Sequence, residues 1–219
     1  KKIWKKNIVK KIDDSVKINT ILISVSDKTG LENFIPGLLE INPDLMILST
    51  GGTYAKIKDI LGKKADRCLT QVSNYTGQPE TQGGLVKTLD FKIYLGLLTE
   101  TYNSAHQEDL KRTSARVIDM VVVNLYPFTE TIKKPGVTLE QARGNIDIGG
   151  PTMIRAAAKN YIRVASVVNP SFYPEILEKL KVSDGALKLE YRFSLAGTAF
   201  AHTAEYDKAI AEYLGTKMK

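Results

Sequence analysis

The segment NIDIGGPTMIRAAAKN, residues 145–160, brings an acid, a Gly-Gly-Pro turn and two bases close together. Asp147 lies two positions before the glycine pair, and Pro151 suits the first position of a helix. Arg155 and Lys159 follow four positions apart, so a helix would carry both on one face. A solvated face would explain such a pair, whereas the alanines between them favour a helix packed against another element. Two interpretations stay open: an ordinary helix start, or one wall of a binding site.

Two further loops contain the side chains that commonly bind phosphate groups. SDKTG (26–30) and TGGT (50–53) each follow an apolar run and precede a helical pattern. The first N–H groups of a helix are unpaired and favour an anion. Each loop alone is also explained as a helix cap or a turn, and neither has the spacing of a P-loop or of a dinucleotide motif. Together they predict a site for a phosphorylated small molecule.

Two single residues add groups that could transfer a proton. Lys87 follows a glycine pair in GGLVKTL (83–89), and Tyr126 lies in NLYPF (124–128) where a strand-like run ends. Surface lysines are common, and a tyrosine before a proline is more often a packing residue. Neither residue is assigned a role on these grounds alone.

The apolar patterns predict the elements that position these loops. Strands are expected at 21–25, 45–50, 117–126 and 164–168, and 91–98 is strand-like although ambiguous. Helices are expected at 31–41, 53–61, 103–113, 137–143, 152–160, 170–182 and 186–214, the last broken near Gly197. Gly150 is expected as the N-cap of the helix at 152–160, and the polar stretch 63–90 predicts no regular element.

Very apolar strands that alternate with helices predict an α/β fold in three layers, a mainly parallel sheet with helices on both faces. Ligands of such sheets bind beyond the carboxyl ends of the strands, where the loops described above lie. The expected organisation is a lysine-rich arm, a sheet domain and a C-terminal helical extension. Their bounds are 1–18, 19–185 and 186–219.

Composition limits the function classes further. The chain has 219 residues, 43% hydrophobic and 25% charged, which is typical of a globular protein. Its single cysteine, Cys68, and its two histidines, His106 and His202, predict no internal disulfide and no zinc cluster. No apolar run is long enough to span a bilayer. A cytoplasmic setting fits these features best.

The net charge of +7 is concentrated at one end of the chain. Residues 1–17 carry +5 of it, which leaves +2 for the remainder and argues against nucleic acid as a partner. Within the arm, Trp4, Ile8, Ile12 and Val16 recur every four residues, which predicts a short amphipathic helix that packs on the body. A membrane-surface or targeting role is the alternative. The arm's two aspartates and its lack of arginine argue against a transit peptide.

Seven segments, taken together and in this order, resemble one domain of a family of bifunctional purine-biosynthesis proteins. The segments are SVSDKTGLENF, STGGT, SNYTGQPE, GGLVKTL, IDMVVVNLYPF, NIDIGGPTMIRAAAKN and HTAEYDKAI. That family joins an AICAR formyltransferase to an N-terminal IMP cyclohydrolase domain, which is the part resembled and which has a methylglyoxal synthase-like fold. The resemblance covers residues 21–214.

The resemblance implies a dehydrative ring closure, in which 5-formamidoimidazole-4-carboxamide ribotide (FAICAR) gives IMP and water. The carboxamide nitrogen attacks the formyl carbon, an oxyanion develops, and hydroxide leaves as water. A weakly acidic amide must lose a proton and an oxygen must gain one, which Lys, Tyr and Asp groups with mutually shifted pKa values can achieve. No metal and no cofactor are implied.

The resemblance assigns residues to two groups by motif. The catalytic group is Lys87, Tyr126, Asp147 and Lys159, with Lys159 as the residue of proton transfer. The substrate-binding group is Ser26, Asp27, Lys28, Thr29, Gly30, Thr50, Gly51, Gly52, Thr53, Lys87, Thr88, Asn124, Asp147, Ile148, Gly149 and Gly150. Arg155 receives no such role and is expected to be a structural or interface residue.

The sequence departs from the family pattern in three ways. Leu85 stands where the family often has an arginine, which removes a bidentate anion donor. Asp90 and Phe91 replace a His-Pro pair and Tyr94 replaces a second histidine, so the part played by that loop is open. The family also continues into a formyltransferase domain, and the sequence does not separate a fragment from a stand-alone enzyme.

The implied partners are a nucleotide, FAICAR or IMP, a second copy of the chain in a homodimer, and a formyltransferase domain or protein. Nucleic acid and membrane are not expected. The alternative is a nucleotide- or phosphate-binding regulatory module of the same fold whose chemistry was lost with the altered KTLDFKIY loop. Methylglyoxal synthase itself is disfavoured by the segments NIDIGGPT and AAAKN.

Overall fold

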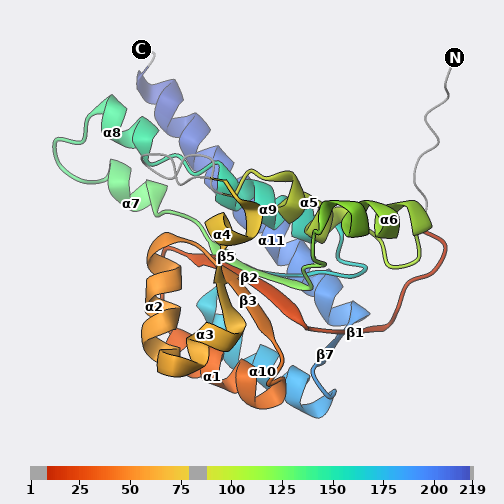
Figure 1. Cartoon of the computed structure of the whole chain (residues 1–219). Helices are drawn as coiled ribbons and strands as arrows, with labels where there is room; N and C mark the ends of the chain where they lie inside the picture. Colours follow the sequence, from red (N-terminus) through yellow and green to blue (C-terminus); the bar gives the residue numbers. More distant parts are fainter. Residues whose placement is uncertain (1–8, 79–87, 218–219) are drawn as a thin grey trace, which may run out of the picture.

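Five parallel strands form the central sheet, in the order β4-β3-β2-β5-β6, with helices on either side (Figure 1). The computed structural model describes residues 9–78 and 88–217. The strands are β2 (Thr20–Val25), β3 (Met46–Ser49), β4 (Leu69–Gln71), β5 (Met120–Asn124) and β6 (Ala165–Val167). The predicted strands at 21–25, 45–50, 117–126 and 164–168 are confirmed. β4 lies in the stretch 63–90, where no element was expected.

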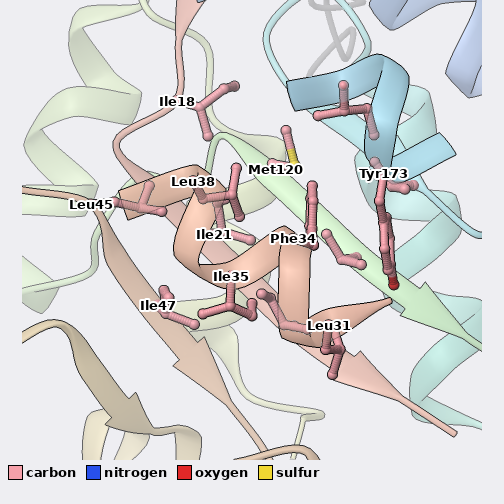
Figure 2. Packing of buried hydrophobic residues seen from close by; sticks show 14 of the residues in the cluster. Ile18, Ile21, Leu31, Phe34, Ile35, Leu38, Leu45, Ile47, Met120 and Tyr173 are labelled. Carbon is pink, nitrogen blue, oxygen red and sulfur yellow. The ribbon is translucent and has the colours of Figure 1, made fainter. Parts of the chain in front are cut away.

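Helices cover both faces of this sheet, which confirms the three-layer architecture (Figure 1). One face carries α1 (Leu31–Ile41), α2 (Gly51–Leu61) and α10 (Tyr173–Val182), and the other carries α5 (Phe91–Leu98), α9 (Gly149–Lys159) and α11 (Leu189–Lys217). Successive strand residues point to opposite faces. Ile21 and Ile23 therefore join the cluster around Phe34 that Figure 2 shows, whereas Leu22 packs with Ile154 in the second cluster.

The strand-like interpretation of residues 91–98 is wrong, because this run folds as α5. Asp90 caps the helix and accepts a hydrogen bond of 2.8 Å from the second N–H group of α5. The buried positions Ile93, Gly96 and Leu97 lie three and four residues apart, as on one face of a helix rather than one face of a strand.

Two other helices differ from their predicted bounds. α9 begins at Gly149, and its N-cap is Ile148 rather than the expected Gly150. α11 continues through Gly197 without the predicted break. A glycine inside a helix costs about 1 kcal/mol relative to alanine, and the packing of α11 against α9 and β6 compensates for this cost. None of the described helices combines the length and the apolar character needed to cross a bilayer.

Shorter helical elements complete the described chain. They are η1 (Gly62–Lys64), α3 (Ala65–Cys68), α4 (Val72–Thr76), α6 (Ser104–Thr113), α7 (Phe128–Ile132), α8 (Leu139–Gly144) and η3 (Pro170–Phe172). α6 and α8 confirm the helices that the sequence predicts at 103–113 and 137–143.

A two-stranded antiparallel ribbon joins the arm to the C-terminal region. β1 (Ser15–Lys17) pairs with β7 (Ala186–Lys188). The amphipathic helix predicted for the arm is wrong over its described part, since residues 9–14 form no helix and β1 follows them; residues 1–8 lie outside the described chain. The arm and the extension thus contact each other although they lie at opposite ends of the sequence.

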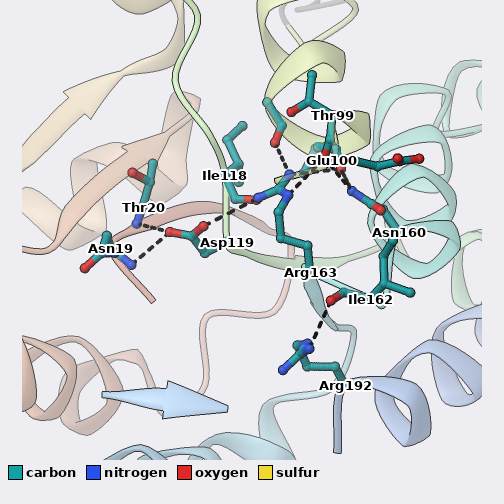
Figure 3. Close-up of polar contacts among 12 residues, drawn as sticks. Asn19, Thr20, Thr99, Glu100, Ile118, Asp119, Asn160, Ile162, Arg163 and Arg192 are labelled. Atoms are coloured by element: carbon teal, nitrogen blue, oxygen red, sulfur yellow. Dashed lines mark hydrogen bonds and ion pairs between the residues drawn. The ribbon is translucent and has the colours of Figure 1, made fainter. Parts of the chain in front are cut away.

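Arg192 of α11 is fully buried beside this ribbon. Its guanidinium donates hydrogen bonds to the carbonyl oxygens of Asp13, Asp14, Tyr161, Ile162 and Leu187. Figure 3 shows the bond to Ile162 and, close by, Arg163 with its ion-pair partner Asp119. Because a guanidinium has five N–H donors, Arg192 can hold the arm, β7 and the segment before β6 at the same time.

Candidate active site

A cleft of about 320 Å³ opens where β2 and β5 end and where α2 and α9 begin. This is the carboxyl edge of the parallel sheet, where ligands are expected, and the volume suits a small molecule. The described residues that line the cleft are Ser24, Val25, Ser26, Lys28, Thr50, Gly52, Thr53, Thr88, Val123, Asn124, Tyr126, Gly144, Ile146, Asp147, Ile148, Gly149, Gly150 and Met153. The three loops singled out in the sequence therefore meet at one site.

The SDKTG loop is held in shape from the neighbouring strand. Asn124, at the end of β5, accepts hydrogen bonds from the N–H groups of Ser26 and Asp27, at 2.7 and 2.9 Å, and donates one of 2.9 Å to the Asp27 carbonyl. The Asp27 carboxylate in turn accepts from the Thr29 N–H at 2.9 Å, and hydrogen bonds from Thr29 lower the pKa of Asp27. Gly30 has a left-handed φ of 80° just before α1. The predicted residues Asp27, Thr29 and Gly30 thus shape the loop without lining the cleft.

Lys28 supplies the positive charge among the described residues of the lining. Its ammonium group donates to the carbonyl oxygens of Val25 and Ser26, at 3.4 and 3.2 Å. A methyl group added at Gly52 would lie 3.9 Å from Lys28 Cε, so the side chain extends past the first turn of α2. Lys28 and the positive end of the α2 dipole therefore favour an anion at the same place.

The TGGT loop ties the start of α2 to the end of β2. Thr53 Oγ1 accepts from the Val25 N–H and donates to the Val25 carbonyl, both at 3.0 Å. The hydroxyl oxygens of Thr50 and Ser24 lie 2.7 Å apart. Thr50, Gly52 and Thr53 line the cleft, whereas Gly51 does not belong to the described lining.

The Gly-Gly pair lets two side chains approach the start of α9. A side chain at Gly149 would overlap the Thr88 hydroxyl. Gly150 donates its N–H to Asp147 Oδ1 at 2.9 Å, and a methyl group there would lie only 2.5 Å from Asp147 Oδ2. Both glycines are therefore required by close packing, since neither has a positive φ. The sequence suggested a turn here, but not the contacts that require it.

Two of the predicted catalytic residues, Asp147 and Tyr126, line the cleft together. Tyr126 follows β5 with 51% of its surface exposed. The backbone N–H of Asp147 donates a hydrogen bond of 2.8 Å to the hydroxyl of Tyr206 on α11. Tyr206 lies in HTAEYDKAI and received no role from the sequence, because nothing local connects it to a loop 59 residues earlier.

The last two predicted catalytic residues are Lys87 and Lys159. Lys87 lies outside the described residues. Lys159 is an exposed residue at the last position of α9 and does not belong to the described lining. Six positions separate it from Met153, the last residue of α9 in that lining, which corresponds to about 9 Å along the helix axis. Arg155, one turn earlier, lies with its guanidinium carbon 5.5 Å from the centre of the Phe200 ring on α11.

Residues 90–94 of the altered KTLDFKIY segment form the N-cap and the first turn of α5. Asp90 is buried and caps α5, and Phe91 is 57% exposed at the first position of that helix. Tyr94 packs against the second core cluster, where burial raises the pKa of its hydroxyl to about 12. None of the three belongs to the described lining of the cleft, and Leu85 lies outside the described chain. The described residues also contain no group of three or more His, Cys, Asp or Glu side chains placed to share a metal ion.

Comparison with known proteins finds two matching families and several similar relatives. The MGS-like domain family matches residues 30–152, and the AICARFT/IMPCHase bienzyme family matches residues 157–219. The bifunctional purine biosynthesis protein PurH of Desulfitobacterium hafniense is 48% identical over 193 residues, and that of Nostoc punctiforme is 46% identical over 193 residues. Each alignment covers 88% of this chain and 36% of the relative, so the chain spans little more than a third of the length of these relatives.

The fold of the chain is also similar to that of a solved structure. The chain superimposes on the crystal structure of ForH with a TM-score of 0.73 and 29% sequence identity, over 89% of this chain and 98% of that one. The similarity therefore extends through the sheet and the helices around it. The chain belongs to the MGS-like domain family, and its C-terminal part matches the AICARFT/IMPCHase bienzyme family.

Proposed function

We propose that this chain is an IMP cyclohydrolase, which closes the ring of FAICAR to give IMP and water. One observation carries the proposal: the SDKTG loop, the TGGT helix start and the Asp147–Gly150 turn line a single cleft of about 320 Å³. The two family matches and the PurH relatives support the same assignment.

The cleft offers different chemistry at its two ends. Lys28, Thr50 and the first turn of α2 would bind the phosphate group of the nucleotide, because they combine a cation, a hydroxyl and helical N–H groups. Asp147 and Tyr126 come from the turn before α9 and the segment after β5, and they would contact the base. Because the two groups of residues bind different parts of a ribotide, the cleft would hold the ribotide in one orientation.

Ring closure forms a bond between the carboxamide nitrogen and the formyl carbon, and later breaks the bond from that carbon to its oxygen. The carboxamide nitrogen gives up one proton and the formamido nitrogen gives up another as its C=N bond forms, and the oxygen gains both before it leaves as water. We assign the Asp147 carboxylate as the proton acceptor and the Tyr126 hydroxyl as a proton donor in this step. Lys87 and Lys159 remain predicted members of this group, from the family resemblance.

We further propose a homodimer in which Lys159 acts in the cleft of the second copy. Lys159 does not belong to the described lining of its own cleft, and six positions, about 9 Å along the helix axis, separate it from Met153, the last residue of α9 in that lining. Lys159 is exposed, so the surface around it is available for such a contact. A formyltransferase domain or protein would supply FAICAR, and the cytoplasm is the proposed setting.

Incubation of the folded chain with FAICAR tests the function, with formation of IMP followed over time. Turnover above the uncatalysed rate is expected. Tight binding of IMP by calorimetry without turnover would contradict the proposal and would favour a regulatory binding module. Release of methylglyoxal from dihydroxyacetone phosphate would contradict it as well.

A further inference from the structure

We propose that Tyr206 is a positioning residue, which holds both segments that carry the cleft's proton-transfer groups. This inference rests on the proposed function for its kinetic consequence. Tyr206 lies on α11 and does not belong to the described lining of the cleft. Its hydroxyl acts through other residues and does not touch the substrate.

The hydroxyl of Tyr206 binds the turn before α9 at two points. It accepts a hydrogen bond of 2.8 Å from the backbone N–H of Asp147, and its oxygen lies 3.4 Å from the Asn145 carbonyl, to which it donates. Asp147 is also held through its carboxylate, which accepts from the Gly150 N–H at 2.9 Å. The main chain and the side chain of Asp147 are therefore anchored separately, the first by α11 and the second by α9.

The ring of Tyr206 reaches the second segment. It lies edge-on to Phe128, with ring centres 6.3 Å apart and planes at 69°. Phe128 is fully buried and donates its N–H to the Tyr126 carbonyl at 2.7 Å. One side chain of α11 thus supports the Asp147 turn by hydrogen bonding and the Tyr126 segment through Phe128.

The buried environment keeps the hydroxyl of Tyr206 protonated, as its two hydrogen bonds require. Burial raises its pKa above the ordinary value, so the group stays protonated near neutral pH. Only the protonated hydroxyl can accept from the Asp147 N–H and donate to the Asn145 carbonyl at the same time.

Tyr213 provides a matched control on the same helix. Its ring also lies edge-on to Phe128, with centres 5.8 Å apart, but its buried hydroxyl has no hydrogen-bond partner among the described residues. Tyr206→Phe and Tyr213→Phe therefore each remove one oxygen and keep one ring contact with Phe128. The two variants differ in whether the oxygen that is lost holds the Asp147 turn.

The test compares both variants with the parent in FAICAR cyclisation and in hydrogen exchange. For Tyr206→Phe we expect kcat to fall by roughly 10- to 100-fold, because a displacement of about 1 Å at a catalytic group has effects of that order. The KM for FAICAR should change much less, since the phosphate-binding end is untouched. The amide of Asp147 should exchange faster in Tyr206→Phe, and Tyr213→Phe should match the parent in all three measurements.

The outcomes separate this inference from the proposed function. A parent without turnover would reject the cyclohydrolase, and the exchange rate of the Asp147 amide would still decide whether Tyr206 holds the turn. A parent with turnover and a Tyr206→Phe variant with unchanged kcat would overturn the inference. Unchanged exchange at Asp147 in a folded Tyr206→Phe variant would overturn it too.

Discussion

Gly150→Ala adds one methyl group at the point where α9 meets the cleft. The backbone there has no positive φ, so alanine can adopt the same conformation. The new Cβ would lie 2.5 Å from Asp147 Oδ2 and 2.7 Å from Leu125 Cδ2, whereas ordinary contacts begin at 3.4 Å. The leucine methyl can yield by a small rotation, but the carboxylate must move by about 1 Å from the position that Gly150 gives it.

Two free-energy terms of opposite sign act on the fold in this variant. Overpacking costs roughly 1 to 3 kcal/mol, and replacing a helical glycine with alanine stabilises by at most about 1 kcal/mol. We therefore expect the free energy of unfolding to fall by roughly 0 to 3 kcal/mol. The effect on kcat is expected to be larger, on the order of 100-fold, because a displacement of this size at a catalytic group disturbs its alignment.

Steady-state FAICAR cyclisation and urea unfolding measure the two effects on the same samples. Gly215→Ala is the control, since Gly215 lies in the last part of α11 and, among the described residues outside its own helical backbone, no atom lies within 4 Å of an added Cβ. The control should keep the parental kcat and gain up to about 1 kcal/mol in unfolding free energy. A Gly150→Ala variant with parental kcat would refute the argument that the glycine exists to admit the Asp147 carboxylate.

Three further predictions concern the fold, its pH dependence and the assembly. Arg192→Lys should lower the free energy of unfolding in urea by roughly 2 to 4 kcal/mol, because an ammonium has three donors for the five carbonyl groups that the guanidinium binds; a loss below about 1 kcal/mol would contradict this. Burial lowers the pKa of His202, and the charge of Glu205 opposes this shift only in part. His202 should therefore lower the free energy of unfolding as pH falls from 7.5 to 5. His202→Gln should flatten that part of the unfolding profile, and an unchanged slope would show the prediction to be wrong. Asp147→Asn and Lys159→Ala subunits, mixed in equal amounts, should restore roughly a quarter of the parental activity. Random pairing makes about half of the dimers heterodimers, and each heterodimer has one intact site out of two. No recovery after proven subunit exchange would place Lys159 outside the partner's cleft.

The sequence by itself determined the features that depend on local patterns. Apolar runs such as 21–25 and 117–126 had to become buried strands, and the helices between them required parallel pairing. Parallel pairing then brought the SDKTG and TGGT loops to one edge of the sheet, because all carboxyl ends of such strands meet there. The family resemblance rested on the order of motifs, which is likewise a property of the sequence alone.

The tertiary structure decided whatever depends on contacts between distant segments. The arm became β1 because its partner is β7, about 170 residues later, and no periodicity within the arm encodes that pairing. Residues 91–98 became a helix because α9 and the sheet cover its Ile93 and Leu97 face, a choice that a short apolar run leaves open. The same holds at the site: the need for Gly150, the hydrogen bonds of Tyr206 and the distance of Lys159 from the cleft follow only from packing α9 and α11 in three dimensions.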